Sequence, residues 1–135
     1  SLAASLAQRL VRLLCEHCKE PYRVSEGELI EVGLTRDDLN ESDPVYRAVG
    51  CEACNQTGYR GRTGIYEILI IDDEIRAMIG GSVDGKSIEN AAIRSGMTSM
   101  RLDGAHKVLA GQTSIAEVLR QTEEESIAAP EPEVA

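Results

Sequence analysis

The sequence lacks tryptophan and phenylalanine, and four tyrosines are its only aromatic residues besides histidine. Hydrophobic residues still make up 42% of the 135 positions. Any core must therefore be aliphatic, built from leucine, isoleucine, valine and alanine. A chain of this length forms one domain, or a small domain with appendages. A small aliphatic core gains stability from an additional staple, such as a bound metal.

Long apolar runs and an excess of positive charge are also missing. No apolar run reaches the roughly 18 residues that indicate a membrane-spanning helix. The first residues do not show a basic leader followed by an uninterrupted apolar stretch, so no signal peptide is predicted. The net charge is −9, from 23 acidic and 14 basic residues. A field of that sign disfavours binding to free nucleic acid or to an anionic membrane surface. We expect a soluble chain in a reducing compartment.

Groups for catalysis are scarce. There is no GxxxxGK[ST] phosphate loop, so this chain cannot bind ATP through such a loop by itself. No activated serine or cysteine nucleophile is evident, and the chain has only two histidines. We interpret His17 as an exposed turn residue and His106 as a solvated residue on the rim of a helix. The sequence therefore predicts no catalytic residue and no cofactor-binding residue.

Hydrophobic spacing predicts the secondary structure. Leucines at positions 2, 6, 10 and 13 have helical spacing, which predicts a helix over residues 1–14. Because this helix has no approach segment, we expect the chain to be cut from a longer protein; a natural N-terminal helix is the alternative. Residues 63–71 are apolar and rich in β-branched side chains, which predicts a strand buried on both faces. Four short helices are predicted over residues 72–122, followed by a disordered acidic tail over residues 123–135.

The strongest chemical signal is a doubled cysteine pair. Two residues separate the cysteines within each pair, and 32 residues separate the pairs: Cys15 and Cys18, then Cys51 and Cys54. Such a gap lets both thiolates of a pair face one point, and two pairs complete a tetrahedron around zinc. Four thiolates close the coordination shell, so the zinc would be structural. Lys19, Arg60 and Arg62 flank the cysteines and would favour thiolates.

Two other interpretations of the cysteines stay open. Disulfides need an oxidising compartment, for which the sequence has no signal. A thiol-redox site normally uses one CxxC pair in a βαβ context, and this chain has two pairs. Metal analysis combined with thiol titration would separate these possibilities from a zinc site.

Three segments resemble the C-terminal part of the secretion ATPases. They are AQRLVRLLCEHCKEPY (7–22), GCEACNQTGYRGRTGIYEIL (50–69) and SGMTSMRLDGAHKVLAGQTSIAEVLRQT (95–122). The family is that of general secretion pathway protein E, the type II secretion ATPase, with the type IV pilus assembly ATPases as relatives. The resemblance covers almost the whole chain, with the motifs in the order of the family.

This resemblance implies an α+β fold: a fragment of a RecA-like ATPase domain, an inserted tetracysteine zinc subdomain and a C-terminal helical domain. The implied division assigns residues 1–14 to the last helix of the RecA-like core, 15–63 to the zinc subdomain, 64–71 to a core strand, 72–122 to the helical domain and 123–135 to the tail. The parent protein would bind ATP and magnesium and form a hexamer. It would drive pseudopilus assembly from the cytoplasmic face of the inner membrane.

The resemblance also limits what this chain does alone. The nucleotide-binding motifs of the family would lie upstream, so the fragment itself would be structural rather than catalytic. Its partners would be other subunits of the motor and inner-membrane secretion components, with neither nucleic acid nor direct membrane insertion. Conspicuous positions of the family pattern are occupied here by Gln8, Arg9, Arg60 and Arg62. Two kinds of role stay open for these residues: contacts to other subunits or to nucleotide, and solvated or salt-bridged structural positions. The alternatives are a fragment of a type IV pilus assembly ATPase, an independent zinc-ribbon interaction module and a thiol-redox protein.

Overall fold

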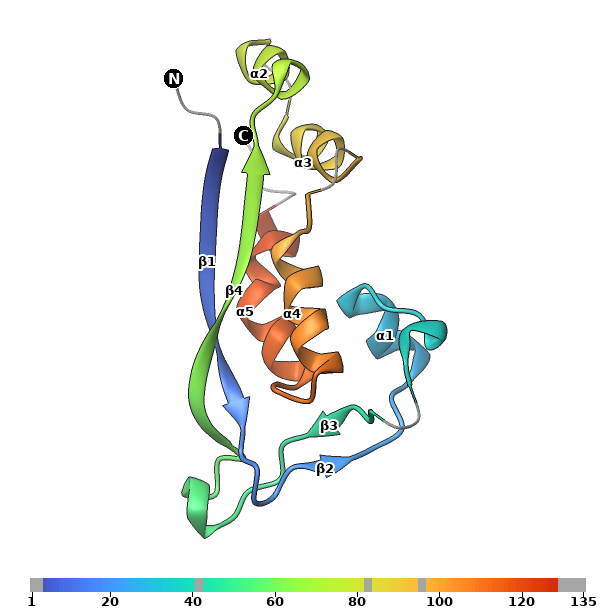
Figure 1. The fold of residues 1–135 in the computed structure, drawn as a ribbon, viewed down its shortest axis with the longest axis vertical. Coiled ribbons are helices and arrows are strands. Elements are labelled where there is room, and N and C mark those ends of the chain that lie inside the picture. The colour runs from blue at the N-terminus through green and yellow to red at the C-terminus, as the bar shows by residue number, and fades with distance from the viewer. Residues whose placement is uncertain (1–3, 41–42, 82–83, 95–96, 129–135) are drawn as a thin grey trace.

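A twisted two-stranded ribbon forms the axis of the molecule (Figure 1). The structure is a computed structural model that describes residues 4–40, 43–81, 84–94 and 97–128. Strand β1 (Ala4–Leu14) pairs antiparallel with strand β4 (Tyr59–Ile70). Helices cover one side of this ribbon, and the residues between the two strands form an insert at its lower end.

The helix predicted for residues 1–14 is wrong over the described part, because Ala4–Leu14 is a strand. A spacing of four residues places Leu6 and Leu10 on one face of a helix. The same even spacing places them on one face of a strand, so the pattern does not separate the two structures. The β-branched partner strand decides the outcome, since cross-strand pairing outweighs a weak local preference.

The strand predicted over residues 63–71 is confirmed, but its burial is not. It begins earlier, at Tyr59, and ends at Ile70. Ile65 is 0% exposed, whereas Ile68 is 49% and Ile70 is 59% exposed. The ribbon therefore has one covered face and one face that is bare in this chain.

The insert carries short elements between the two long strands: β2 (Glu20–Pro21), α1 (Glu26–Val32), η1 (Arg36–Asp38), β3 (Tyr46–Arg47) and η2 (Glu52–Cys54). β2 and β3 pair antiparallel. A capping box of Ser25 and Glu28 begins α1, and Gly33 ends it in the left-handed conformation, with φ 92°. Local sequence signals therefore determine both ends of this helix.

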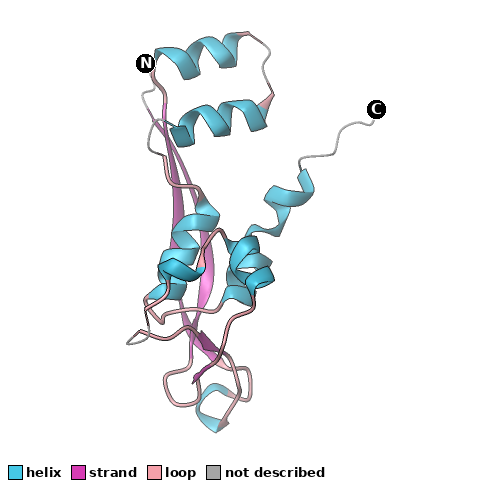
Figure 2. Cartoon of the chain, turned by 90° about the vertical axis from the view of Figure 1, so that its right-hand side faces the viewer, coloured by secondary structure: helices cyan, strands magenta, loops and turns pink. Residues whose placement is uncertain are grey.

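Four helices follow the ribbon, as predicted: α2 (Asp73–Gly80), α3 (Gly85–Arg94), α4 (Met100–Leu109) and α5 (Ile115–Ala128). Helices α4 and α5 lie along the ribbon, and Figure 2 shows α2 and α3 as a pair at its other end. The disorder predicted from residue 123 is wrong as far as Ala128, where α5 ends. Residues 129–135 lie outside the described part of the chain.

The largest hydrophobic cluster joins the insert to the last two helices. Its members come from the insert (Val24, Leu29, Val32, Leu34 and Val45), from α4 (Ala105 and Val108) and from α5 (Ile115 and Val118). We call this cluster the shared core. A smaller cluster of Val11, Ile65 and Met100 attaches the ribbon to α4. Helices α2 and α3 have their own cluster around Ile75 and Ala91. The insert and α4–α5 therefore form one packed unit.

The crossing of α4 and α5 gives a first prediction. A Cβ added at Gly104 would lie 2.6 Å from Cγ1 of Val118. Alanine improves helix propensity by about 1 kcal/mol, but overpacking costs about 1–3 kcal/mol. We expect Gly104→Ala to lower the free energy of unfolding by on the order of 1 kcal/mol in urea titrations.

Gly80→Ala is the matched control, because nothing lies within 4 Å of a Cβ at that position in α2. It should be neutral or stabilising. Adding Val118→Ala to Gly104→Ala should relieve the overlap and cost less than the sum of the two single changes. Equal stability of the Gly104→Ala and Gly80→Ala variants would contradict the assigned crossing.

Candidate metal centre

The chain topology brings the two cysteine pairs to the same end of the ribbon. Cys15 directly follows β1, and Cys54 ends the short helix η2 before β4 begins. Antiparallel pairing places Leu14 opposite Tyr59, and the amide of Cys15 donates to the carbonyl of Gly58 at 2.9 Å. The insert therefore leaves and re-enters the ribbon at one point, where the four cysteines meet.

The four Sγ atoms all lie within 4.8 Å of one another. Sγ of Cys15 lies 3.8 Å from that of Cys51, Sγ of Cys18 lies 3.9 Å from that of Cys54, and Cys51 and Cys54 are 3.8 Å apart. Zinc–sulfur bonds of about 2.3 Å in a tetrahedron place the sulfur atoms about 3.8 Å apart. All four cysteines are free. The arrangement fits one metal ion held by four sulfur ligands.

Backbone amides surround the sulfur atoms. The amide of Gly50 donates to Sγ of Cys18 at 3.3 Å, and those of Cys51 and Gly58 donate to Sγ of Cys54 at 3.2 and 3.1 Å. Hydrogen bonds of this kind favour the charged form of an acceptor. They therefore prepare the sulfur atoms for metal binding, which requires thiolates.

The pKa values of two thiols reflect these contacts. Burial acts to raise the pKa of Cys54, but amides of Cys51 and Gly58 outweigh it and lower the pKa to about 6. The amide of Gly50 acts to lower the pKa of Cys18, yet burial and the neighbouring thiols raise it to about 11. The thiol of Cys54 thus ionises near neutral pH, whereas a metal ion would have to displace the proton from the thiol of Cys18.

The charged residues beside the cysteines have other contacts or none. Nζ of Lys19 donates to the carbonyl of Gly111 at 3.0 Å and lies 4.3 Å from the centre of the Tyr46 ring. Arg60 and Arg62 are exposed in β4, and within the described part of the chain neither side chain makes a hydrogen bond or ion pair. His17 is exposed, as predicted. The amides, rather than these cations, surround the sulfur atoms.

Other residues singled out in the sequence lie away from the cysteines. Nε2 of Gln8 donates to the hydroxyl of Tyr66 at 3.4 Å, and Nη1 of Arg9 donates to the carbonyl of Gln121 at 3.2 Å. These contacts are consistent with structural roles inside the chain. His106 is exposed on α4, as predicted.

Sequence reasoning missed the part that α5 plays beside the site. Ser114 and Glu117 have the spacing of a capping box, and Oγ of Ser114 accepts from the amide of Glu117 at 3.1 Å. The carboxylate of Glu117, however, contacts the guanidinium of Arg12, which is 105 residues away in the sequence. No local pattern indicates such a contact, since it depends on how α5 packs against β1.

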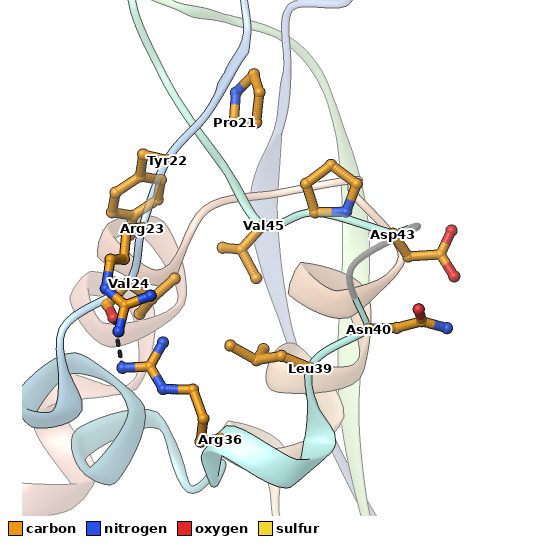
Figure 3. A pocket seen from close by; sticks show the side chains of 10 residues that line it. Pro21, Tyr22, Arg23, Val24, Arg36, Leu39, Asn40, Asp43 and Val45 are labelled. Carbon is orange, nitrogen blue, oxygen red and sulfur yellow. Dashed lines mark hydrogen bonds between the residues drawn. The ribbon is translucent and has the colours of Figure 1, made fainter.

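A separate cleft lies in the insert, between the segment that follows β2 and the segment that precedes β3 (Figure 3). Its volume is about 590 Å³. Val24 and Val45 are buried there, and Arg36 donates to the carbonyl of Val24 at 2.8 Å. Its described lining residues include no cysteine or histidine, so this cleft is separate from the cysteine cluster.

The turn after η2 gives the second prediction. Gly58 has φ +86°, and a Cβ there would lie 2.6 Å from Cβ of Ala48. We expect Gly58→Ala to displace the amide that donates to Cys54 and to weaken zinc binding by about tenfold or more. Competition with a chromogenic chelator measures this. Gly61→Ala is the control: it also has positive φ, but its nearest contact is Leu13 Cδ1 at 3.6 Å, so zinc affinity should stay unchanged.

Comparison with known proteins agrees with the arrangement of motifs. Residues 1–120 match the family described as "Type II/IV secretion system protein". The chain is 49% identical over 125 residues to type II secretion system protein E of Aeromonas hydrophila, covering 93% of this chain and 24% of that protein. It is 45% identical over 124 residues to type II secretion system ATPase E of Vibrio cholerae, covering 92% and 24%.

A further relative, the type IV pilus assembly ATPase PilB of Thermus thermophilus, is 41% identical over 122 residues, covering 90% of this chain and 14% of that protein. The chain thus spans about a quarter or less of the length of these relatives. None of the described helices is long and apolar enough to cross a membrane. The resemblance found in the sequence is confirmed: the chain belongs to the type II/IV secretion system protein family.

Proposed function

We propose that this chain is the zinc-bearing C-terminal part of an ATPase that powers type II protein secretion. The observation that carries the proposal is the convergence of four sulfur atoms within 4.8 Å of one another, in a chain whose relatives include one named a type II secretion system ATPase. The type II relative from Aeromonas has a higher identity than the PilB relative from Thermus. This difference favours type II secretion over pilus assembly.

The proposed ligands are the two predicted pairs, Cys15 with Cys18 and Cys51 with Cys54. Zinc bound there would neutralise the thiolates and link the two ends of the insert. With four sulfur ligands its shell is closed, so no position is left for a reacting water. The metal's proposed contribution is structural: binding free energy appears as folding free energy of the insert.

The parent protein is the longer polypeptide of which we propose this chain is a part. ATP and magnesium binding, hexamer assembly, pseudopilus assembly and a position at the cytoplasmic face of the inner membrane are proposed for that parent. The chain itself would act as a structural and contact region. Residues 15–63 are proposed as the zinc subdomain and 72–122 as the helical domain, with strands β1 and β4 as the connection to a RecA-like core.

The bare face of the ribbon supports this connection. Successive side chains of a strand alternate between faces, so partners in the β1–β4 register share one face. Large exposed hydrophobic side chains gather on the bare face: Leu6 (65%), Leu10 (46%), Tyr66 (41%), Ile68 (49%) and Ile70 (59%). Exposed apolar patches of this kind mark contact surfaces, and isolated two-stranded sheets are marginally stable in water. We propose that the remainder of the parent covers this face.

The exposed hydrophobic side chains on the bare face also disfavour the alternative that this chain is an independent zinc-ribbon module. Such a module would have to keep five large hydrophobic side chains in water. Its net charge of −9 also disfavours nucleic acid as a partner. Salt-dependent binding of DNA or RNA by the purified chain would favour that alternative.

The third prediction tests the metal. We expect the purified chain to contain one zinc ion and Cys51→Ser to lose it. Because the shared core joins the insert to α4 and α5, amide exchange should accelerate in all three on loss of zinc. Helices α2 and α3 have a separate cluster and should keep most of their protection. In the parent, the same change should impair secretion.

Two results would contradict this prediction. One is elemental analysis without metal, together with four titratable thiols or two disulfides. The other is unchanged amide exchange across residues 15–54 in the Cys51→Ser variant, which would mean that the metal supports nothing there.

The fourth prediction tests the bare face. Leu6→Lys with Ile68→Glu, opposite charges placed directly opposite each other in the register, should leave the melting temperature of this chain nearly unchanged. In the parent, where we propose that the face is buried, the pair should lower it by several degrees. Ile30→Lys on α1, 75% exposed, is the control and should change neither. Equal effects of the ribbon pair in chain and parent would refute the proposed cover.

A further inference from the structure

One turn holds both strands that lead to the cysteines. Between α4 and α5, the carbonyl of Gln112 accepts from the amide of Leu14 at 2.8 Å. The hydroxyl of Thr113 donates to the carbonyl of Arg12 at 2.7 Å. The hydroxyl of Ser114 lies 2.7 Å from that of Tyr59, at the start of β4. The turn therefore fixes the end of β1 and the beginning of β4 together.

Glu117 adds an ion pair to this arrangement. Its side chain is fully buried, and Oε1 accepts from Nε and Nη2 of Arg12 at 3.1 and 2.9 Å. Its other oxygen accepts from the backbone amide of Arg12 at 2.9 Å. Burial acts to raise the pKa of Glu117, but the contacts with Arg12 outweigh it and keep that pKa lowered. A buried carboxylate with this many donors holds its partner in one position.

Arg12 extends the connection across the ribbon. Its guanidinium lies 4.0 Å from the centre of the Tyr59 ring, a cation–π distance. Arg12 precedes Cys15 by three residues and Tyr59 follows Cys54 by five. The ribbon's register shifts between Arg12 and Leu14, so the regular strand ladder is interrupted directly beside the site. The contacts from α5 supply the constraint at that interruption.

We propose that Glu117 is a positioning residue for the metal site: through Arg12 it holds the two strand ends that set the spacing of the cysteine pairs. This inference rests on the proposed zinc site. Because coupling between two sites is reciprocal, zinc also stabilises α5. The factor by which Glu117→Gln weakens zinc binding therefore equals the factor by which bound zinc increases the cost of that substitution to the folded state.

The test compares zinc affinity in the full chain and in Glu117→Gln, which keeps the size of the side chain and removes its charge. We expect the variant to bind zinc about tenfold more weakly in chelator competition, within the range seen when outer-shell contacts are lost. Glu117→Gln should also accelerate amide exchange of α5 more with zinc bound than without it, and the ratio of the two accelerations should be similar to the change in zinc affinity. Far-UV circular dichroism confirms that the zinc-loaded variant is folded.

Glu26→Gln is the matched control. Glu26 makes an exposed ion pair with Arg36 at 2.8 Å in the insert, away from the strand ends. The Glu26→Gln substitution should leave zinc affinity unchanged. Arg12→Lys keeps the positive charge but not the two-pronged contact, and should weaken zinc binding less than Glu117→Gln. This second variant decides the question if Glu117→Gln does not fold.

The outcomes separate this inference from the proposed function. Unchanged zinc affinity in Glu117→Gln or, if that variant is unfolded, in Arg12→Lys, would overturn the inference while leaving the zinc site in place. A lower melting temperature alone would then mark the ion pair as a packing contact. If the unchanged chain binds no zinc at all, the proposed function fails first, and the inference falls with it.

Discussion

The antiparallel pairing of β1 with β4 is the interaction on which the rest of this structure depends. It places Leu14 opposite Tyr59, and so brings together two chain positions that the whole insert separates. Closing so long a loop carries an entropy cost. The ladder, the contacts from the α4–α5 turn and four convergent sulfur atoms all act at this closure. Each of them would be less effective without the other two, because each relies on the same strand register.

The shared core extends this dependence beyond the cysteines. Val24, Leu29 and Val32 of the insert pack with Val108 and Val118 of the last helices. An insert with such contacts is not an independent appendage, although its sequence position between two strands suggests one. Its apolar surface is buried only when α4 and α5 are in place. Interactions that hold the insert closed therefore contribute to the stability of helices far away in the sequence.

Local signals in the sequence predict much of this fold, and long-range contacts explain what they miss. The caps around α1, the strand after Thr63 and the convergence of the cysteine pairs follow from short patterns. The first segment does not, because Leu6 and Leu10 fit a helix and a strand equally well until the partner strand is known. The contact of Glu117 with Arg12 was equally out of reach. Their separation of 105 residues gives no periodicity to detect.

The two faces of the ribbon connect these observations. On the covered face, Val11 and Ile65 pack with Met100 of α4, so this part of the sheet is complete within the chain. On the other face, Leu6 and Ile68 lie opposite each other and remain exposed. If the proposed cover is present, the ribbon lies between two layers, of which this chain supplies one. The metal end of the ribbon is fixed by contacts inside the chain, so a body packed on the bare face would hold the insert in a defined orientation. In the proposed parent, that rigidity is what a structural zinc site would contribute without taking part in the chemistry of ATP.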